Sequence, residues 1–462
     1  MTITLYPDQQ QFIGDVRAAM RQHKRLIAQA YCGFGKTVIA AEMTARAYEK
    51  GKRVLFAVHR KQIRRQTILT FQREGIPTGI VGQGMKQRVM VGTMPAISRR
   101  LGTLDADLLF IDEGHIYAPG FAQVHEHYAS RGAYIVCLTA TPTRFNGRGM
   151  RPYYEHIVEG PTARWLIDNG RLSDYKLFAP QLVDTDGLHT SHGEFVTSEV
   201  ESLMMEKATI TGDAIKHWRT HANQMRTLVF CASIAHAQDV AGKFSDAGIR
   251  AASMDATTPD TKRQEIINAF ADGKLHVISN CMLASEGFDL SAQVGRDVPV
   301  EAVVMLRPTK SLSLYIQMSG RALRKKDERA VILDHVGNCH EHGLPDSEHE
   351  WSLDGRQKKA KAAAVFTCKQ CYGTFATPFR YCPNCGEATA VSLAGRAAPQ
   401  EVDGELRELD RHSHDTIQSR SLIYAERRNL RTLEELEQYA QTKGYKPGWA
   451  RHIYQARLAK RA

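Results

Sequence analysis

The chain has 462 residues, more than one hydrophobic core usually organises, so two large domains with a smaller appendage are expected. Hydrophobic residues make up 43% and charged residues 24%, and no apolar run approaches the roughly 18 residues that cross a bilayer, which excludes a membrane-spanning protein. Lysine plus arginine is 61 against 50 for aspartate plus glutamate, which gives a net charge of +11. A polyanionic partner explains this excess of positive charge better than a contribution to solubility alone.

The start of the chain, Met1 to Gln11, lacks the basic residues and the apolar stretch of a secretory signal, so a cytoplasmic location is expected. Five of the nine cysteines are scattered, mostly in apolar runs where a free cysteine behaves as a small hydrophobe. These five are Cys32, Cys137, Cys231, Cys281 and Cys339.

Apolar, β-branched runs alternate with helical patterns twice along the chain, which is typical of parallel sheets covered by helices. The first set of expected strands is Leu26–Gln29, Val54–Val58, Val89–Gly92, Leu108–Ile111 and Ile135–Thr139. The second set is Thr227–Cys231, Ala251–Met254, His276–Asn280, Ala302–Leu306 and Ala330–Leu333. The sequence therefore predicts an α/β fold with two tandem parallel-sheet domains.

The two sets of strands define the expected domains. Residues 1–145 form the first domain and 226–350 the second, and the turn-rich segment 146–225 between them is a connector with an insertion. A cysteine cluster at 362–390 and a charged helical module at 405–462 follow.

A phosphate-binding loop is expected where the first strand meets a helical run. The sequence there reads Ala-Tyr-Cys-Gly-Phe-Gly-Lys-Thr over residues 30–37. Gly33 and Gly35 let backbone N–H groups turn around a phosphate, Lys36 supplies a positive charge, and the Thr37 hydroxyl can ligate Mg²⁺. Ala30 replaces the first glycine of the general pattern.

An acidic pair, Asp112 and Glu113, ends the fourth expected strand of the first set. Carboxylates at the carboxyl end of a central strand face the crevice where open α/β sheets bind ligands. Asp112 would hold Mg²⁺, and Glu113 would orient and deprotonate the attacking water. Since such a pair is often only a helix start, the assignment depends on the phosphate loop upstream.

Four cysteines form two closely spaced pairs, a pattern that specifies a tetrahedral zinc site in a structural ribbon. Disulfides are the alternative, although nothing in the sequence indicates an oxidising compartment. Basic and aromatic residues nearby suit either contact with nucleic acid or the core of the ribbon itself. The cysteines are Cys368, Cys371, Cys382 and Cys385.

The Asp-Glu-Gly-His box at 112–115 resembles that of the superfamily 2 DExH-box helicases, which carry two RecA-like domains. By the same resemblance, the Thr-Ala-Thr-Pro segment at 139–142 couples hydrolysis to domain movement, and Gln9 reads the adenine base. The Ser-Glu-Gly-Phe-Asp segment at 285–289 would place Gly287 and Asp289 near the ribose of ATP.

The second domain carries a Gln-x-x-Gly-Arg-x-x-Arg motif at 317–324 that resembles the arginine-finger motif of the same superfamily. The resemblance makes Gln317, Arg321 and Arg324 catalytic, with the arginines neutralising charge on the γ-phosphate. Their spacing puts both arginines on one face if they share a helix. The alternative is a solvated basic helix end.

Contacts with the nucleic-acid strand are expected from loops that follow strands. By resemblance these contacts involve Arg60, Gln62, Thr93 and Ser233, and they touch backbone phosphates without reading bases. For Arg60 the alternative is an ordinary surface arginine.

Together with the cysteine cluster and the helical tail, the core resembles RadD-like DNA repair helicases, including phage and prophage relatives. The resemblance implies a nucleic-acid-dependent ATPase that uses ATP, Mg²⁺ and Zn²⁺ on single-stranded, forked or branched DNA. It also implies a nucleoid-associated location in a bacterial or phage-infected cell, and single-strand-binding, repair or replication proteins as partners. An RNA helicase and a nucleic-acid-binding adaptor with an inactive motor remain the alternatives.

Overall fold

The computed structural model describes residues 4–355, apart from 145–146, 180–184, 186, 192, 207, 256 and 282–289. It also describes the short stretches 366–367, 374–375, 381, 408–409, 432–442 and 450. The chain divides into two compact units, Met1–Ala363 with Ala394–Glu408, and Ala364–Leu393 with Leu409–Ala462.

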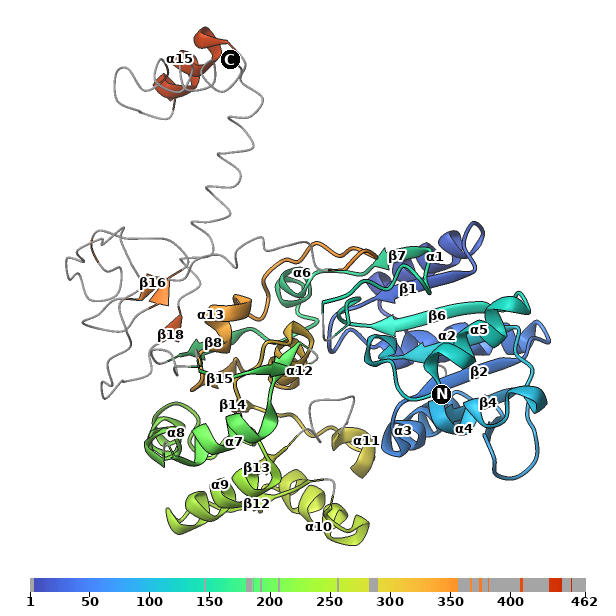
Figure 1. The fold of residues 1–462 in the computed structure, drawn as a ribbon. Helices are drawn as coiled ribbons and strands as arrows, with labels where there is room; N and C mark the ends of the chain where they lie inside the picture. Colours follow the sequence, from blue (N-terminus) through green and yellow to red (C-terminus); the bar gives the residue numbers. More distant parts are fainter. Residues whose placement is uncertain are drawn as a thin grey trace. The chain divides into compact units, whose positions relative to one another are not determined.

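The first sheet of the larger unit has seven parallel strands in the order β3-β4-β2-β5-β6-β1-β7 (Figure 1). Its strands are β1 (Arg25–Gln29), β2 (Val54–Val58), β3 (Thr78–Ile80), β4 (Val89–Thr93), β5 (Leu108–Asp112), β6 (Tyr134–Thr139) and β7 (His156–Glu159). Helical segments α1 (Pro7–Met20), α2 (Lys36–Glu49), α3 (Lys61–Arg73), α4 (Met94–Ser98), η1 (Leu101–Thr103), η2 (Gly114–Ile116), α5 (Phe121–Ser130) and α6 (Ala163–Asp168) accompany it.

The second sheet of the same unit has the strand order β12-β13-β11-β14-β15-β8-β18. Its strands are β8 (Tyr175–Phe178), β11 (Thr227–Cys231), β12 (Ala251–Ser253), β13 (Val277–Asn280), β14 (Ala302–Leu306), β15 (Ala330–Asp334) and β18 (Glu408–Leu409). The helices are α7 (Thr197–Glu206), α8 (Ala208–His221), α9 (Ile234–Asp246), α10 (Asp260–Ala271), α11 (Leu290–Val294), α12 (Leu312–Ala322) and α13 (Asn338–His342), and β9 (Thr190–Ser191) pairs with β10 (Glu194–Phe195).

The central strands are buried along their whole length, because helices cover both faces of a parallel sheet. Every residue of β2, β11, β14 and β15 is buried. Phe56 of β2 packs edge-to-face on Phe71 of α3, with ring centroids 5.5 Å apart. Such runs of Val, Ile, Leu and Phe are what the sequence pattern predicted, and the prediction of two parallel α/β sheets is confirmed.

Every predicted strand is present, with bounds that differ by one residue at most. The segment predicted as a connector differs more, since it contributes β7 to the first sheet beside β1 and β8 to the second beside β15. Both strands are short and mix polar with apolar residues, so they lack the apolar runs that identified the others.

In the smaller unit, β16 (Phe366–Thr367) and β17 (Thr374–Phe375) form an antiparallel pair, and α15 (Leu433–Thr442) is the described helix. The four cysteines of the predicted zinc site lie outside the described residues, as do Gly287 and Asp289. Among the described helices, none combines the length and apolar character needed to span a bilayer.

Candidate active site between the two sheets

The phosphate-binding loop joins β1 to α2 and begins the helix at Lys36. Gly33 and Gly35 have φ angles of +89° and +97°, which favour glycine. Space also requires glycine, because a Cβ at Gly33 would lie 2.7 Å from Leu172 and one at Gly35 would lie 2.6 Å from the amide of Gln9. Glycine at these two positions therefore avoids a clash with Leu172 on one side of the loop and with Gln9 on the other.

The lysine of this loop faces the acidic pair at the end of β5. Lys36 Nζ lies 3.4 Å from Glu113 Oε1, and the lysine and glutamate side chains are 13% and 6% exposed. Burial opposes the charge on Lys36, but the attraction of Glu113 prevails and raises the lysine pKa. The loop and the strand end thus share one buried ion pair.

The two carboxyl groups have pKa values shifted in opposite directions. Burial and the negative charge of Glu113 raise the pKa of Asp112 to about 6. Burial also acts on Glu113, but nearby Lys36, His115 and His59 outweigh it and lower the Glu113 pKa. The pair therefore favours one firmly ionised carboxylate beside a carboxyl group that a bound cation would ionise fully.

Glu113 follows its strand with a φ of +47°, a left-handed conformation that is rare for a residue with a side chain. Its N–H donates to the carbonyl of Leu138 in β6 at 2.8 Å, which fixes this turn against the neighbouring strand. Backbone strain of this kind costs of order 1–3 kcal/mol and is common at functional sites.

His115 joins three parts of the site. Its Nδ1 lies 3.3 Å from Glu113 Oε2 and 2.8 Å from the hydroxyl of Thr139 at the end of β6. Its Nε2 lies 2.9 Å from the hydroxyl of Ser313, in the first turn of α12. One buried imidazole thus contacts the acidic pair, the Thr-Ala-Thr-Pro segment and the second sheet's helix.

A cavity of about 470 Å³ lies between the two sheets, and its wall includes residues from both. Among the predicted site residues, ten line it: Gln9, Gly33, Gly35, Lys36, Thr37, Asp112, Glu113, Gln317, Arg321 and Arg324. The structure therefore brings the phosphate loop, the acidic pair and the arginine motif to one place.

Gln9 sits in the first turn of α1 and lies against the phosphate loop. Its amide nitrogen donates to the carbonyl of Phe34 at 2.7 Å, and its amide oxygen accepts from the Tyr6 N–H at 3.1 Å. Gln9 is only 5% exposed, so it is not a solvated terminal glutamine.

The arginine motif departs from the predicted geometry in one respect. Gln317 and Arg321 lie on α12, but the helix ends at Ala322, so Arg324 is not on the helix face shared with Arg321. Arg324 instead forms a β-bridge with Leu172, a residue from the segment after α6. Arg321 therefore lines the cavity from α12, and Arg324 lines it from the segment that follows the helix.

Helix α12 also approaches the phosphate loop closely at Gly320. A Cβ at Gly320 would lie 2.7 Å from the Cβ of Cys32, so this position requires glycine for close packing of the two sheets' elements.

The predicted strand contacts lie at the expected strand ends. Arg60 caps α3 after β2, with Gln62 in the helix's first turn, and Thr93 ends β4. Ser233 begins α9, where its hydroxyl accepts from the His236 N–H at 3.0 Å and donates to Glu201 at 2.7 Å. The Ser233 hydroxyl therefore has a structural role as a helix cap.

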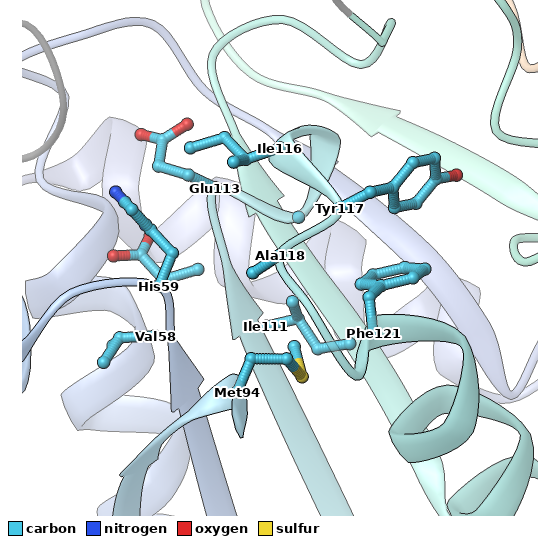
Figure 2. Close-up of a pocket in the computed structure, with 11 residues that line it drawn as sticks. Val58, His59, Met94, Ile111, Glu113, Ile116, Tyr117, Ala118 and Phe121 are labelled. Carbon is cyan, nitrogen blue, oxygen red and sulfur yellow. The ribbon is translucent and has the colours of Figure 1, made fainter. Parts of the chain in front are cut away.

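A smaller cavity of about 10 Å³ lies beneath the acidic pair. Figure 2 shows Glu113 and His59 at one end of it, with Tyr117 and Phe121 at the other and Met94 below. His59 directly precedes Arg60, so the acidic pair lies close to one of the predicted strand contacts.

Sequence patterns missed several residues of the larger cavity, including Tyr6, Arg171, Asp297 and Lys325. They missed His115 as a link between the sheets as well. Helix α3 also lines the cavity with three polar residues, Gln66, Thr67 and Thr70. Their grouping on one face of the helix is a pattern that the sequence alone could have revealed.

The residues fit a Mg²⁺ ion. Thr37 and Asp112 line one cavity and offer hard oxygen ligands, and the raised pKa of Asp112 reflects a carboxyl group whose charge is poorly compensated. Within the described part of the chain there is no cluster of three or more histidine, cysteine, aspartate or glutamate side chains that could hold a metal.

Two family models match the chain, one over residues of the first sheet and one over residues of the second. Residues 2–144 match the model described as type III restriction enzyme, res subunit, and residues 206–326 match the helicase conserved C-terminal domain. The two matches correspond to the two halves of the cavity.

Similar proteins cover most of the chain. A 51.5 kDa protein of a Lactococcus phage (isolate 7-9) is 33% identical over 387 residues, or 82% of this chain and 81% of that protein. A protein of Schizosaccharomyces pombe that carries the name of a mitochondrial ATP-dependent helicase, irc3, is 27% identical over 72% of this chain. This chain spans 57% of the length of that protein.

Among solved structures, the ATP-dependent Type ISP restriction-modification enzyme LlaBIII bound to DNA is similar in fold, with a TM-score of 0.53 and 16% identity. The likeness covers 72% of this chain and 28% of that one. With the restriction-enzyme res subunit model matching residues 2–144, the helicase C-terminal model matching residues 206–326 and the phage relative 33% identical over 82% of this chain, the chain belongs to the superfamily 2 helicases, ATP-dependent enzymes that act on nucleic acid.

Proposed function

We propose that the protein is a RadD-like helicase or translocase that hydrolyses ATP to move on or remodel DNA in repair or replication. The observation that carries this proposal is the single cavity that collects the phosphate loop, the acidic pair and the arginine motif from two sheets. A site divided in this way can convert ATP binding and hydrolysis into opening and closing of the sheets.

The roles of the side chains follow from their chemistry. Lys36 binds the phosphates of ATP, while Thr37 and Asp112 would hold a Mg²⁺ ion, which would supply positive charge against the phosphates. Glu113 orients the attacking water and takes its proton, a role that suits a carboxylate kept ionised by Lys36.

The second sheet completes the reaction site. Arg321 and Arg324 supply positive charge to the γ-phosphate as the bond to it breaks. Gln317 is 4% exposed, and its amide nitrogen is buried with no hydrogen-bond partner, so a phosphate oxygen or the attacking water would satisfy it.

DNA as the track is supported by the restriction-enzyme family model that matches residues 2–144, and by the net charge of +11. Arg60 and Gln62 lie at the start of α3, just after β2, and Thr93 ends β4, so all three lie at the carboxyl edge of the sheet, where side chains can follow a phosphate backbone without reading bases.

The test is ATP turnover with single-stranded, duplex and forked DNA and with RNA of the same sequence, at 50 and 200 mM salt. We expect DNA to stimulate turnover most, and stimulation to fall with salt because phosphate contacts release counterions. Stronger stimulation by RNA under all conditions would replace the proposal with an RNA helicase.

An Arg60→Ala variant tests the track contact. Loss of one phosphate contact should reduce the slope of log affinity against log salt by about one. Arg131→Ala is the matched control, since that exposed arginine caps α5 and bonds to His127 away from the proposed track. An unchanged slope for Arg60→Ala would remove this residue from the interface.

We also propose that Cys368, Cys371, Cys382 and Cys385 hold one structural zinc ion, on the spacing of the two pairs. Metal analysis of the purified chain should give one zinc per chain, and Cys382→Ser should release it while sparing ATP binding. Unchanged metal content in Cys382→Ser would point to another ligand set.

A further inference from the structure

The chain that follows α13 returns to the first sheet, in a segment that neither matching family model covers. We call residues 343–355 the strap, which is the orange coil that leaves α13 in Figure 1. The two family matches end at residues 144 and 326, before the strap begins. The strap connects the two sheets a second time, in addition to the segment that carries α6.

Two buried tyrosines, one from each half of the active site, bond to the start of the strap. The hydroxyl of Tyr31 in the phosphate loop donates to the carbonyl of Pro345 at 2.8 Å. The hydroxyl of Tyr315 in α12 donates to the carbonyl of Gly343 at 2.9 Å. Gly343 directly follows α13, and the two residues from there to Pro345 span at most about 7 Å. The Tyr31 bond therefore keeps the end of α13 close to the phosphate loop.

Asp346 holds the same part of the strap against the segment between the sheets. It is 2% exposed, and its carboxylate accepts from Arg164 of α6 at 3.0 Å and from the hydroxyl of Tyr175 in β8. A buried carboxylate is costly unless a charge partner and hydrogen bonds compensate it, and here both are present. The neighbouring Pro345 carbonyl is therefore held at a fixed place when it accepts from the phosphate loop.

The far end of the strap packs into the first sheet's core, beside the chain that follows the Thr-Ala-Thr-Pro segment. Leu353 belongs to the buried apolar cluster of that sheet and is 6% exposed. Its carbonyl accepts from the N–H groups of Met150 and Arg151 at 2.8 and 2.9 Å. A Cβ at Gly149 would lie only 2.1 Å from the same carbonyl oxygen, so the two backbones are in direct contact.

We propose that the strap holds the two sheets together for ATP hydrolysis, and that Tyr31 is the positioning residue through which it acts on the phosphate loop. Separation of the sheets requires the Tyr31 bond to break or the strap to leave the first sheet. Tyr31 is not among the described residues that line the cavity, so it acts on the loop without touching the nucleotide. The proposal rests on ATP hydrolysis at this cavity and applies to a DNA or an RNA track.

Tyr31→Phe tests the contact at the phosphate loop, since it removes one hydroxyl group and keeps the ring. The kcat for ATP at saturating nucleic acid should fall about fivefold, which is the effect of one buried hydrogen bond on a closing equilibrium. The Kd for ADP should stay unchanged, because the groups that line the cavity are retained. An unchanged kcat would overturn the proposal, and so would an equal loss in kcat and in ADP affinity, which would indicate a distorted loop.

Tyr128→Phe is the matched control for a loss of stability. The Tyr128 hydroxyl is also buried and donates to a backbone carbonyl, that of Leu104, at 2.9 Å within the first domain. Tyr128→Phe should lower the melting temperature about as much as Tyr31→Phe does and leave kcat unchanged. An equal fall in kcat in both variants would attribute the effect to stability and refute the role of the strap.

Gly149→Ala tests the far end of the strap. Gly149 does not have a positive φ, so alanine there strains only the packing against Leu353, whose backbone must move. The kcat should fall while the Kd for ADP stays unchanged. Gly242→Ala is the control, because a Cβ at Gly242 would meet nothing within 4 Å, and it should leave both values unchanged.

A double-mutant cycle on kcat asks whether the two ends act as one strap. If they do, the effects of Tyr31→Phe and Gly149→Ala should be non-additive by about threefold or more, since the loss of either end already releases the sheets. Additive effects would show two independent contacts and refute the strap. Each value is compared with the unmodified protein, whose own turnover tests the ATPase activity separately.

Discussion

His115 and Ser313 join the two sheets through one buried contact, with Nε2 of the histidine 2.9 Å from the hydroxyl of the serine. The same imidazole contacts Glu113 and Thr139, so a change in the charge or position of Glu113 reaches α12 through a single side chain. Arg321 lies on that helix, and the contact therefore connects the acidic pair to the arginine motif.

Ser313→Ala should uncouple nucleic-acid binding from ATP turnover. Loss of one buried hydrogen bond is worth about 1 kcal/mol, so we expect about a fivefold fall in kcat at saturating nucleic acid. The KM for ATP should change little, because Ser313 is not among the residues lining the nucleotide cavity. Steady-state ATP hydrolysis with and without nucleic acid measures both quantities.

Ser245→Ala is the control for this variant, since the Ser245 hydroxyl donates to the carbonyl of Ala241 within α9. It should leave stimulated turnover unchanged. Full stimulation of Ser313→Ala would show that the His115 contact is structural and carries no signal.

Glu113→Gln should bind ATP and a nucleic-acid strand but hydrolyse ATP about 10²- to 10⁴-fold more slowly. The amide keeps the shape of the side chain, but it cannot accept the proton of the attacking water. Equilibrium binding of ATP and single-turnover hydrolysis separate the two effects. Hydrolysis at the normal rate would transfer the role of general base to another residue.

The parts of this site that sequence patterns predicted are those that short segments encode. Lys36 and Thr37 follow a strand at fixed spacing, and Asp112 ends another, so local order alone placed them at one sheet edge. The burial of β2, β11, β14 and β15 follows from continuous apolar runs in the same way.

What the patterns could not supply are contacts between segments far apart in the chain. Arg171 stacks on Tyr6 and Arg324 bridges Leu172, and neither pairing leaves a periodic signal. The spacing of Arg321 and Arg324 suggested a shared helix, but α12 ends between them because the backbone at Arg324 pairs with Leu172 instead of continuing the helix. Tertiary pairing overrode the local helical preference.

Gly320→Ala should impair ATP hydrolysis by separating α12 from the phosphate loop. The added methyl group would lie 2.7 Å from the Cβ of Cys32, closer than such atoms approach, so one of the two elements must move. A shift of about 1 Å at a catalytic site can cost on the order of 10²-fold in rate. The melting temperature should change less than the activity if the two sheets still fold.

Cys32→Gly removes the clashing Cβ and should restore part of the activity of Gly320→Ala, whereas Cys32→Ala keeps that Cβ and should not. This pair of double variants distinguishes a local clash from a general loss of stability. Equal activity of the two double variants would mean that the clash with Cys32 is not the cause.

Four buried histidines should make the fold sensitive to acid. Burial lowers the pKa of His335 to about 3 and those of His125, His217 and His236 to about 4. An unfolded histidine titrates near 6.5, so between these values the unfolded state binds more protons than the folded state. The stability contributed by neutral burial is therefore present above about pH 6.5 and is lost as pH falls toward 4.

His335→Phe should flatten this dependence, because it removes the group with the lowest pKa and keeps a ring beside His217, whose centroid lies 5.2 Å away. Each such histidine contributes a slope of up to about 1.4 kcal/mol per pH unit between its two pKa values. The free energy of unfolding from denaturant titrations at pH 4.5, 5.5 and 7.5 measures that slope. The exposed His156 provides the control, and His156→Gln should reproduce the slope of the unmodified protein. A slope in His335→Phe equal to that of the control would place the acid-sensitive groups elsewhere in the fold.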